Sequence, residues 1–219
     1  MLEPTNILTE KQLFFLKLFS TSPLTKSFYL SGGAALCGFY IPYRYSEDLD
    51  FLSENEFDIQ SILVWLKSIK KQLEYDSFDI QTSFNRNLIF LEFGSETLKT
   101  EFTYYPFPSK ASQKYLNVTI DSLEDIALNK LFTIYQNPRF RDFMDLFKII
   151  QEKKFDFRQL RLDAKAKFDW DIEMIQLGSQ LLKVTARKDI PVLVGIFDYG
   201  EIEAFFTNIA SSLQSEVLK

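Results

Sequence analysis

Two aspartates, Asp48 and Asp50, are separated by a single leucine. On an extended strand alternate side chains project to the same side, so both carboxylates would lie on one face, with Leu49 and Phe51 on the other. Neighbouring carboxylates repel each other unless a cation lies between them, and Mg²⁺ prefers hard oxygen ligands. The spacing therefore predicts a site for Mg²⁺ or Mn²⁺. A solvent-exposed edge strand with two surface acids is the alternative interpretation.

A glycine pair precedes these acids in the run Ser31-Gly32-Gly33. It follows a short apolar run of strand type, residues 28–30, and residues 34–40 are expected to be helical. Glycine permits a sharp turn and a close approach to the backbone, and unpaired N–H groups at the start of a helix favour an anion. We therefore expect these three residues to hold phosphate groups through backbone donors.

Arg44 and Ser46 come just before the aspartates. A guanidinium at this position could pair with Asp50 or hold a phosphate oxygen, so both residues are candidates for nucleotide binding. A surface arginine without such a role is the alternative.

One longer pattern joins the glycine pair to the aspartate pair. It consists of Gly32-Gly33-x-Ala35-Leu36, then an arginine, then Ser46-x-Asp48-Leu49-Asp50-Phe51. This pattern resembles the first motif of the nucleotidyltransferase superfold, specifically that of the AbiEii/AbiGii toxin family. The family signature has threonine after the glycine pair, where this chain has Ala34. The change removes one hydrogen bond but leaves the backbone donors.

A third carboxylate is expected on a strand that returns beside the aspartates. Residues 88–93 and 98–103 are predicted to be consecutive strands joined by a turn at Gly94. On the second of them, Glu101 shares a face with Lys99, and the resemblance places the third acid of the superfold on this strand. Glu92, one strand earlier, is the rival candidate. The resemblance thus implies that Asp48, Asp50 and Glu101 bind the metal.

The second half of the family signature is matched further along the chain. The matching residues are Leu123-Glu124-Asp125-Ile126-Ala127-Leu128-Asn129-Lys130 and then Arg141-Asp142-x-x-Asp145-Leu146. The resemblance implies that a helical lysine and this second helix face the nucleotide site. Lys130 would then contact the triphosphate, and Asp142 would orient Lys130 or help to activate the acceptor. From the residues alone, a buried stem with a solvated amine is favoured for Lys130 over a group directed into a cleft.

The remaining pattern divides the chain near residue 120. We predict an α+β fold in which residues 1–120 form a nucleotidyltransferase-like catalytic domain, a mixed β-sheet with flanking helices, and residues 121–219 form a helical domain. Helices are expected over 9–19, 57–73, 121–135, 139–147, 170–184 and 200–218, and a further short strand over 116–120.

Composition excludes several kinds of chemistry. The 219 residues include no histidine, which rules out histidine-based zinc sites and Ser-His-Asp triads. The single cysteine, Cys37, cannot form an internal disulfide, and the N-terminus lacks the features of a secretory signal, so we expect a cytoplasmic protein. No apolar stretch is long enough to span a membrane. The net charge of −5 argues against a uniformly basic nucleic-acid binder.

The resemblance implies an enzyme that moves a nucleoside monophosphate from an NTP to an acceptor. It also implies the toxin half of a toxin–antitoxin pair, with tRNA as an acceptor and a cognate antitoxin protein as a partner. A small-molecule nucleotidyltransferase of the aminoglycoside-modifying type is the alternative among enzymes. A non-catalytic nucleotide-binding module is the alternative outside them.

Overall fold

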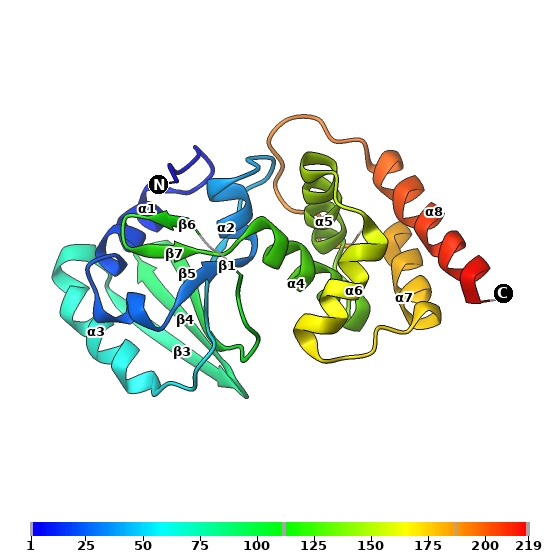
Figure 1. Cartoon of the computed structure of the whole chain (residues 1–219). Helices are drawn as coiled ribbons and strands as arrows, with labels where there is room; N and C mark the ends of the chain where they lie inside the picture. The colour runs from blue at the N-terminus through cyan, green and yellow to red at the C-terminus, as the bar shows by residue number, and fades with distance from the viewer. Residues whose placement is uncertain (1, 111–112, 187, 218–219) are drawn as a thin grey trace. The chain divides into compact units, whose positions relative to one another are not determined.

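The computed structural model describes residues 2–110, 113–186 and 188–217. The chain forms two compact units, Met1–Ser122 and Leu123–Lys219 (Figure 1). The first contains the sheet and the second contains helices only within its described residues, so the α+β class predicted from the sequence is confirmed. No helix in the described part of the chain has both the length and the apolar character needed to cross a membrane.

Within its described residues the first unit has a seven-stranded mixed sheet with the order β3-β4-β5-β2-β1-β7-β6. The strands are β1 (Tyr29–Ser31), β2 (Asp48–Ser53), β3 (Ser77–Ser83), β4 (Arg86–Phe93), β5 (Glu96–Tyr104), β6 (Gln113–Tyr115) and β7 (Val118–Ile120). The central strand β2 is parallel to β5 and antiparallel to β1, and β1 is parallel to β7. The β3–β4, β4–β5 and β6–β7 pairs are antiparallel.

The register of the central strands brings the acids predicted from the sequence together. Asp50 lies opposite Glu101 on β5 and opposite Ser31 on β1, and Asp48 lies opposite Lys99. Because paired residues on neighbouring strands project to the same side, Asp48, Asp50 and Glu101 share one face of the sheet.

The opposite face of the sheet is the core of this unit. Leu49 and Phe51 of β2 are fully buried there, as the alternation along the strand predicted. Phe51 stacks on Phe102 at 4.9 Å between ring centroids and is 4.4 Å from Phe19, while the indole of Trp65 meets Phe19 edge-on. These rings attach the helices α1 (Glu10–Phe19) and α3 (Ile59–Leu73) to β2 and β5. Burial of several large aromatic side chains dominates the packing free energy.

In the described part of the first unit, four helical segments accompany the sheet. Thr9 caps the first through a capping box with Gln12. The segments are α1 (Glu10–Phe19), the 3-10 helix η1 (Pro23–Lys26), α2 (Gly32–Phe39) and α3 (Ile59–Leu73). The strand expected over 116–120 is shorter in the structure, because Leu116 has a left-handed backbone, φ 52°, in the turn between β6 and β7.

The second unit is built around a central helix, α4, which contacts α5, α6 and α7, while α8 packs on α7 (Figure 1). Its segments are α4 (Leu123–Gln136), α5 (Phe140–Lys153), α6 (Phe157–Phe168), α7 (Met174–Leu181), the 3-10 helix η2 (Leu182–Ala186) and α8 (Tyr199–Val217). Phe132 stacks on Phe168 at 4.1 Å and Phe143 meets Phe206 at 5.2 Å, so aromatic pairs join the helices. The helix expected from residue 170 begins only at Met174.

Candidate active site

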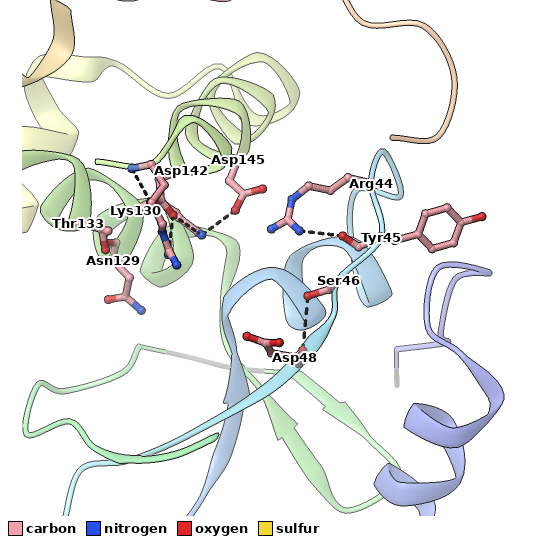
Figure 2. Close-up of polar contacts among 10 residues, drawn as sticks. Arg44, Tyr45, Ser46, Asp48, Asn129, Lys130, Thr133, Asp142 and Asp145 are labelled. Carbon is pink, nitrogen blue, oxygen red and sulfur yellow. Dashed lines mark hydrogen bonds and ion pairs between the residues drawn. The ribbon is translucent and has the colours of Figure 1, made fainter. Parts of the chain in front are cut away.

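The two aspartates of β2 are half-buried, whereas Leu49 and Phe51 between and after them are fully buried. Asp48 accepts a hydrogen bond from Lys99 Nζ at 2.7 Å, and its backbone carbonyl accepts one from Ser46 Oγ at 3.4 Å (Figure 2). The aspartates therefore do not lie on a fully solvated edge strand. They lie on a central strand, with a basic side chain from the next strand beside them.

The glycine pair contacts this group from the start of α2. Gly32 has φ +65°, and a Cβ placed on it would lie 2.1 Å from Asp50 Oδ2. A Cβ on Gly33 would lie 2.4 Å from Arg44 Nη2 and 2.9 Å from Ser46 Oγ. Both positions thus lack room for a side chain, because the backbone is in contact with polar atoms there. The structure brings together the glycines, Arg44, Ser46 and Asp50, as the sequence predicted.

Arg44 is only 3% exposed, so the alternative of a surface arginine is wrong. Its Nη1 donates to the backbone carbonyl of Tyr45 at 2.9 Å (Figure 2). The guanidinium is therefore held against the glycine turn, where its charge favours an anion.

Glu101 is almost fully buried on the same face and is held by a residue that the sequence analysis missed. Arg86 donates from Nε to Glu101 Oε1 at 2.7 Å and from Nη2 to Oε2 at 2.6 Å, and Thr103 Oγ1 donates to Oε1 at 2.7 Å. Burial alone would raise the pKa of Glu101, but these hydrogen bonds and the charges of Arg86 and Lys99 outweigh it and hold the pKa below its ordinary value. We call Asp48, Asp50, Lys99, Glu101 and Arg86 the acid face.

The rival third acid, Glu92, lies farther along the hairpin. It is opposite Thr97, whose hydroxyl donates to it at 2.8 Å, whereas the residue of β4 opposite Glu101 is Leu88. Glu101, and not Glu92, is therefore the acid in register with Asp50.

Asp48 and Asp50 offer adjacent carboxylate oxygens on one face, which is a donor set suited to Mg²⁺ or Mn²⁺. Among the described residues, however, no group of three Asp, Glu or Cys side chains is arranged to hold a metal ion. Glu101 instead directs both oxygens at Arg86. The aspartate pair thus fits a divalent cation, and a role for Glu101 as third ligand stays a prediction.

Ser31, at the start of the glycine turn, is fixed by a second residue that the sequence analysis missed. Its Oγ donates to Asp121 Oδ2 at 2.6 Å, and the fully buried Asp121 also accepts from Ser109 Oγ and from the backbone N–H of Ser122. Ser31 precedes α2 as its N-cap residue, yet its side chain makes no capping hydrogen bond. Its hydroxyl group therefore anchors the turn to the strand end rather than to the first turn of the helix.

Tyr40 lies close to the same residue, Asp121. Its hydroxyl donates to the backbone carbonyl of Asp121 at 2.9 Å. Burial, and then the negative charge of Asp121, raise the pKa of Tyr40 to about 12, so its hydroxyl stays a donor across the physiological range.

In the second unit, Lys130 of α4 reaches two carboxylates of α5 (Figure 2). Its Nζ is 2.8 Å from Asp142 Oδ1 and 2.7 Å from Asp145 Oδ2, and both aspartates are fully buried. Arg139 also donates to Asp142. Burial alone would raise the pKa of Asp142, but the charges of Lys130 and Arg139 and their hydrogen bonds outweigh it and lower that pKa. Lys130, Asp142 and Asp145 are hereafter the lysine cluster.

The prediction that Asp142 orients Lys130 agrees with their direct contact. The sequence also indicated Asp145, because it lies three residues after Asp142 and therefore on the same side of α5. What Lys130 does to a nucleotide stays a prediction.

The fold has been seen in other proteins. A crystal structure of JHP933 from Helicobacter pylori superposes with a TM-score of 0.59 at 20% identity, covering 95% of this chain and 94% of that one. A second structure from H. pylori also gives 0.59, at 21% identity over 97% and 99% of the two chains. Sheet, glycine turn and strand aspartates together define a nucleotidyltransferase-like fold, as predicted.

The family follows from the sequence match. Residues 14–210 match the family described as nucleotidyl transferase AbiEii toxin, type IV toxin–antitoxin system. An uncharacterized protein of Aquifex aeolicus (strain VF5), aq_aa25, is 30% identical over 187 residues, which are 84% of this chain and 86% of that protein. The chain belongs to the AbiEii family and is a nucleotidyltransferase. The resemblance expected from the sequence is confirmed, with Ala34 as a departure from the signature.

Proposed function

We propose that this chain transfers a nucleoside monophosphate from an NTP to a hydroxyl group of an acceptor, in a reaction that requires Mg²⁺ or Mn²⁺. The observation that carries the proposal is the contact between the glycine turn and the aspartate pair, where a Cβ on Gly32 would be 2.1 Å from Asp50 Oδ2. The backbone proposed to bind phosphate and a carboxylate proposed to bind the metal are therefore in contact in the first unit.

Each residue is given a role that its surroundings support. Ser31, Gly32 and Gly33 would hold the β- and γ-phosphates through backbone donors, and the buried guanidinium of Arg44 would add positive charge beside Gly33. Asp48 and Asp50 would hold the cation. At such carboxylates a divalent cation neutralises triphosphate charge and lowers the pKa of an attacking hydroxyl group.

The remaining predicted roles fall to Glu101, Lys130 and Asp142. Glu101 would be the third metal ligand. Lys130 would stabilise the charge of leaving pyrophosphate, with Asp142 holding its amine or helping to activate the acceptor. In the reaction the acceptor oxygen bonds to the α-phosphorus, the bond from that phosphorus to the oxygen that bridges to the β-phosphate breaks, pyrophosphate leaves, and the hydroxyl proton passes to water.

For the acceptor we propose a tRNA, and for the partner a cognate antitoxin protein in the cytoplasm of the host. The family description supports a toxin and an antitoxin system. The exposed lysines of α3 (Lys67, Lys70 and Lys71) add local positive charge to a chain with a net charge of −5.

The test is incubation of the full chain with each labelled NTP, Mg²⁺ and total tRNA, followed by gel separation. We expect labelled tRNA from the wild type and a loss of at least ~10²-fold in Asp48→Asn and Asp50→Asn. Asp79→Asn is the matched control, because Asp79 is an exposed acid on β3. Its activity should equal that of the wild type.

Other outcomes distinguish the alternatives. Label on a small aminoglycoside and none on tRNA would support the small-molecule enzyme. Tight NTP binding without transfer to any acceptor would support a non-catalytic module. Wild-type protein that neither binds NTP with Mg²⁺ nor transfers nucleotide would overturn the proposal.

A further inference from the structure

Arg86 lies at the start of β4, and neither the expected motif nor the strand pattern assigns it a function. Its side chain is 58% exposed, while that of its partner Glu101 is 10% exposed. The two side chains meet across the β4–β5 pair, where Arg86 is opposite Thr103, two residues beyond Glu101. One member of this ion pair is therefore in contact with solvent and the other is enclosed.

The ion pair occupies the carboxylate that the metal site would need. Oε1 of Glu101 accepts from Arg86 Nε and from Thr103 Oγ1, and Oε2 accepts from Arg86 Nη2. Oε1 thus has two donors, and a cation bound at the remaining acceptor site of Oε2 would lie beside the positively charged guanidinium, so a cation and Arg86 compete for Glu101. Because the guanidinium is more than half exposed, water can replace the carboxylate around it, so opening is much less costly than for a buried pair.

The charges of the acid face support an exchange of this kind. Three carboxylates, Asp48, Asp50 and Glu101, face two bases, Lys99 and Arg86, which gives a net charge of −1. The positive charge of Arg86 is stabilised by Glu101 first and by Asp50 and Asp48 as well, so it lies within the field of all three acids. A guanidinium in that field disfavours a second cation and favours a phosphate.

We propose that Arg86 is an exchangeable counter-ion of Glu101: it releases the carboxylate when a divalent cation binds the acid face, and the freed guanidinium then binds the triphosphate. The assignment rests on the proposed function for the identity of the nucleotide. It adds a substrate-binding residue outside the motif, with Glu101 as the group that holds it until the metal arrives.

The exchange predicts two effects of opposite sign. Without nucleotide, Arg86 competes with the metal, so its removal should tighten metal binding. With nucleotide and saturating metal, Arg86 holds phosphate, so its removal should weaken NTP binding. A residue that only supports the fold of the sheet would weaken both.

The experiment titrates Mn²⁺ into the full chain without nucleotide, with free Mn²⁺ measured by electron paramagnetic resonance. We expect Arg86→Gln to bind Mn²⁺ about fivefold more tightly than the wild type, as expected for loss of one partly exposed competing charge. At saturating Mg²⁺ the KM for NTP should rise about tenfold with a smaller change in kcat. Arg86→Lys should have a Mn²⁺ affinity and a KM between those of the wild type and Arg86→Gln, since an ammonium group keeps the charge but lacks the paired geometry of a guanidinium.

A double-variant cycle makes the test specific. Glu101→Gln should bind Mn²⁺ more weakly than the wild type, and adding Arg86→Gln in that background should tighten Mn²⁺ binding much less than it does in the wild type. Arg158→Gln, at an exposed position on α6, is the matched control and should behave as the wild type. Circular dichroism should show equal folding of all variants.

An unchanged or weaker Mn²⁺ affinity in folded Arg86→Gln would overturn the exchange, as would a wild type that binds no Mn²⁺. Failure of the proposed function has a different signature. In that case the wild type transfers no nucleotide, while the effect of Arg86 on Mn²⁺ is still measurable.

Discussion

The acid face of the first unit and the lysine cluster of the second both pair carboxylates with basic side chains, but the two groups differ in how far the bases are exposed to solvent. In both, carboxylates carried by regular elements are paired with basic side chains at 2.6–2.8 Å. On the acid face the bases are partly exposed, 58% for Arg86 and 31% for Lys99. In the lysine cluster the Lys130 side chain is 10% exposed and both aspartate side chains are fully buried.

This difference separates exchangeable pairs from fixed ones. A partly exposed base can leave its carboxylate when water solvates the freed base and a bound cation takes its place beside the carboxylate. A buried pair cannot open without leaving a desolvated charge behind. We therefore expect the acid face to change its partners on ligand binding and the lysine cluster to keep its geometry.

The largest effect should come from Lys130→Met. The substitution leaves Asp142 and Asp145 buried with one partner fewer, and loss of one member of a buried ion pair costs about 3–5 kcal/mol. Urea denaturation of the full chain should show this as a lower free energy of unfolding.

Two further variants sharpen this prediction. Lys165→Met removes an exposed pair with Asp171, in which the side chains are 56% and 70% exposed, and should cost less than about 1 kcal/mol. The triple variant Lys130→Met, Asp142→Asn, Asp145→Asn removes the buried charges together and should recover part of the loss. Equal costs for Lys130→Met and Lys165→Met would contradict the distinction between fixed and exchangeable pairs.

The next largest effect concerns the glycine turn, which contacts Asp50 of the acid face. Gly32→Ala places a Cβ on a backbone with φ +65° and 2.1 Å from Asp50 Oδ2. Strain of the left-handed backbone costs about 1–2 kcal/mol, and displacement of the carboxylate about 1–3 kcal/mol more. Thermal unfolding should show the loss, and activity should fall because Asp50 must move.

Gly94→Ala separates the two contributions. Gly94 has φ +61° but nothing within 4 Å of an added Cβ, so it carries the backbone strain without the contact. Its cost should be about 1 kcal/mol and its activity unchanged. If both variants unfold at the same temperature, Asp50 does not pack against the turn as the structure has it.

Local patterns in the sequence predicted the helices and strands, the glycine turn and the aspartate pair. The alternation over Asp48–Phe51 was enough to assign inward and outward side chains, because a strand has period two. The sharp turn at Gly32 followed from its immediate neighbours as well. Such features depend on residues within a few positions of one another.

The partners of the site could not be found in this way, because they depend on pairing between distant segments. Asp121 is 90 residues from Ser31 and reaches it only because β7 runs parallel to β1. Arg86 reaches Glu101 through the register of a hairpin, and a shift of one residue would have placed its side chain on the other face. The alternating acids and bases of β5 indicated the face, but not which base belongs to which acid.

The smallest effect should appear on acidification, and it tests whether the lysine cluster holds its charges. The pKa of Asp142 is lower in the folded protein than its ordinary value of 3.8, because Lys130 and Arg139 outweigh its burial. A group whose pKa is depressed by folding adds stability above its ordinary pKa, and this stability is lost as the pH falls through the folded value.

The free energy of unfolding of the wild type should therefore exceed that of Asp142→Asn by a constant amount above pH 4.5, and the gap should narrow as the pH falls below 3.8. Asparagine cannot ionise, so the variant lacks this part of the pH dependence. Denaturation in urea at a series of pH values measures both curves. A gap that widens toward acid pH would mean that folding raises the pKa of Asp142, and Lys130 and Arg139 would then not outweigh its burial.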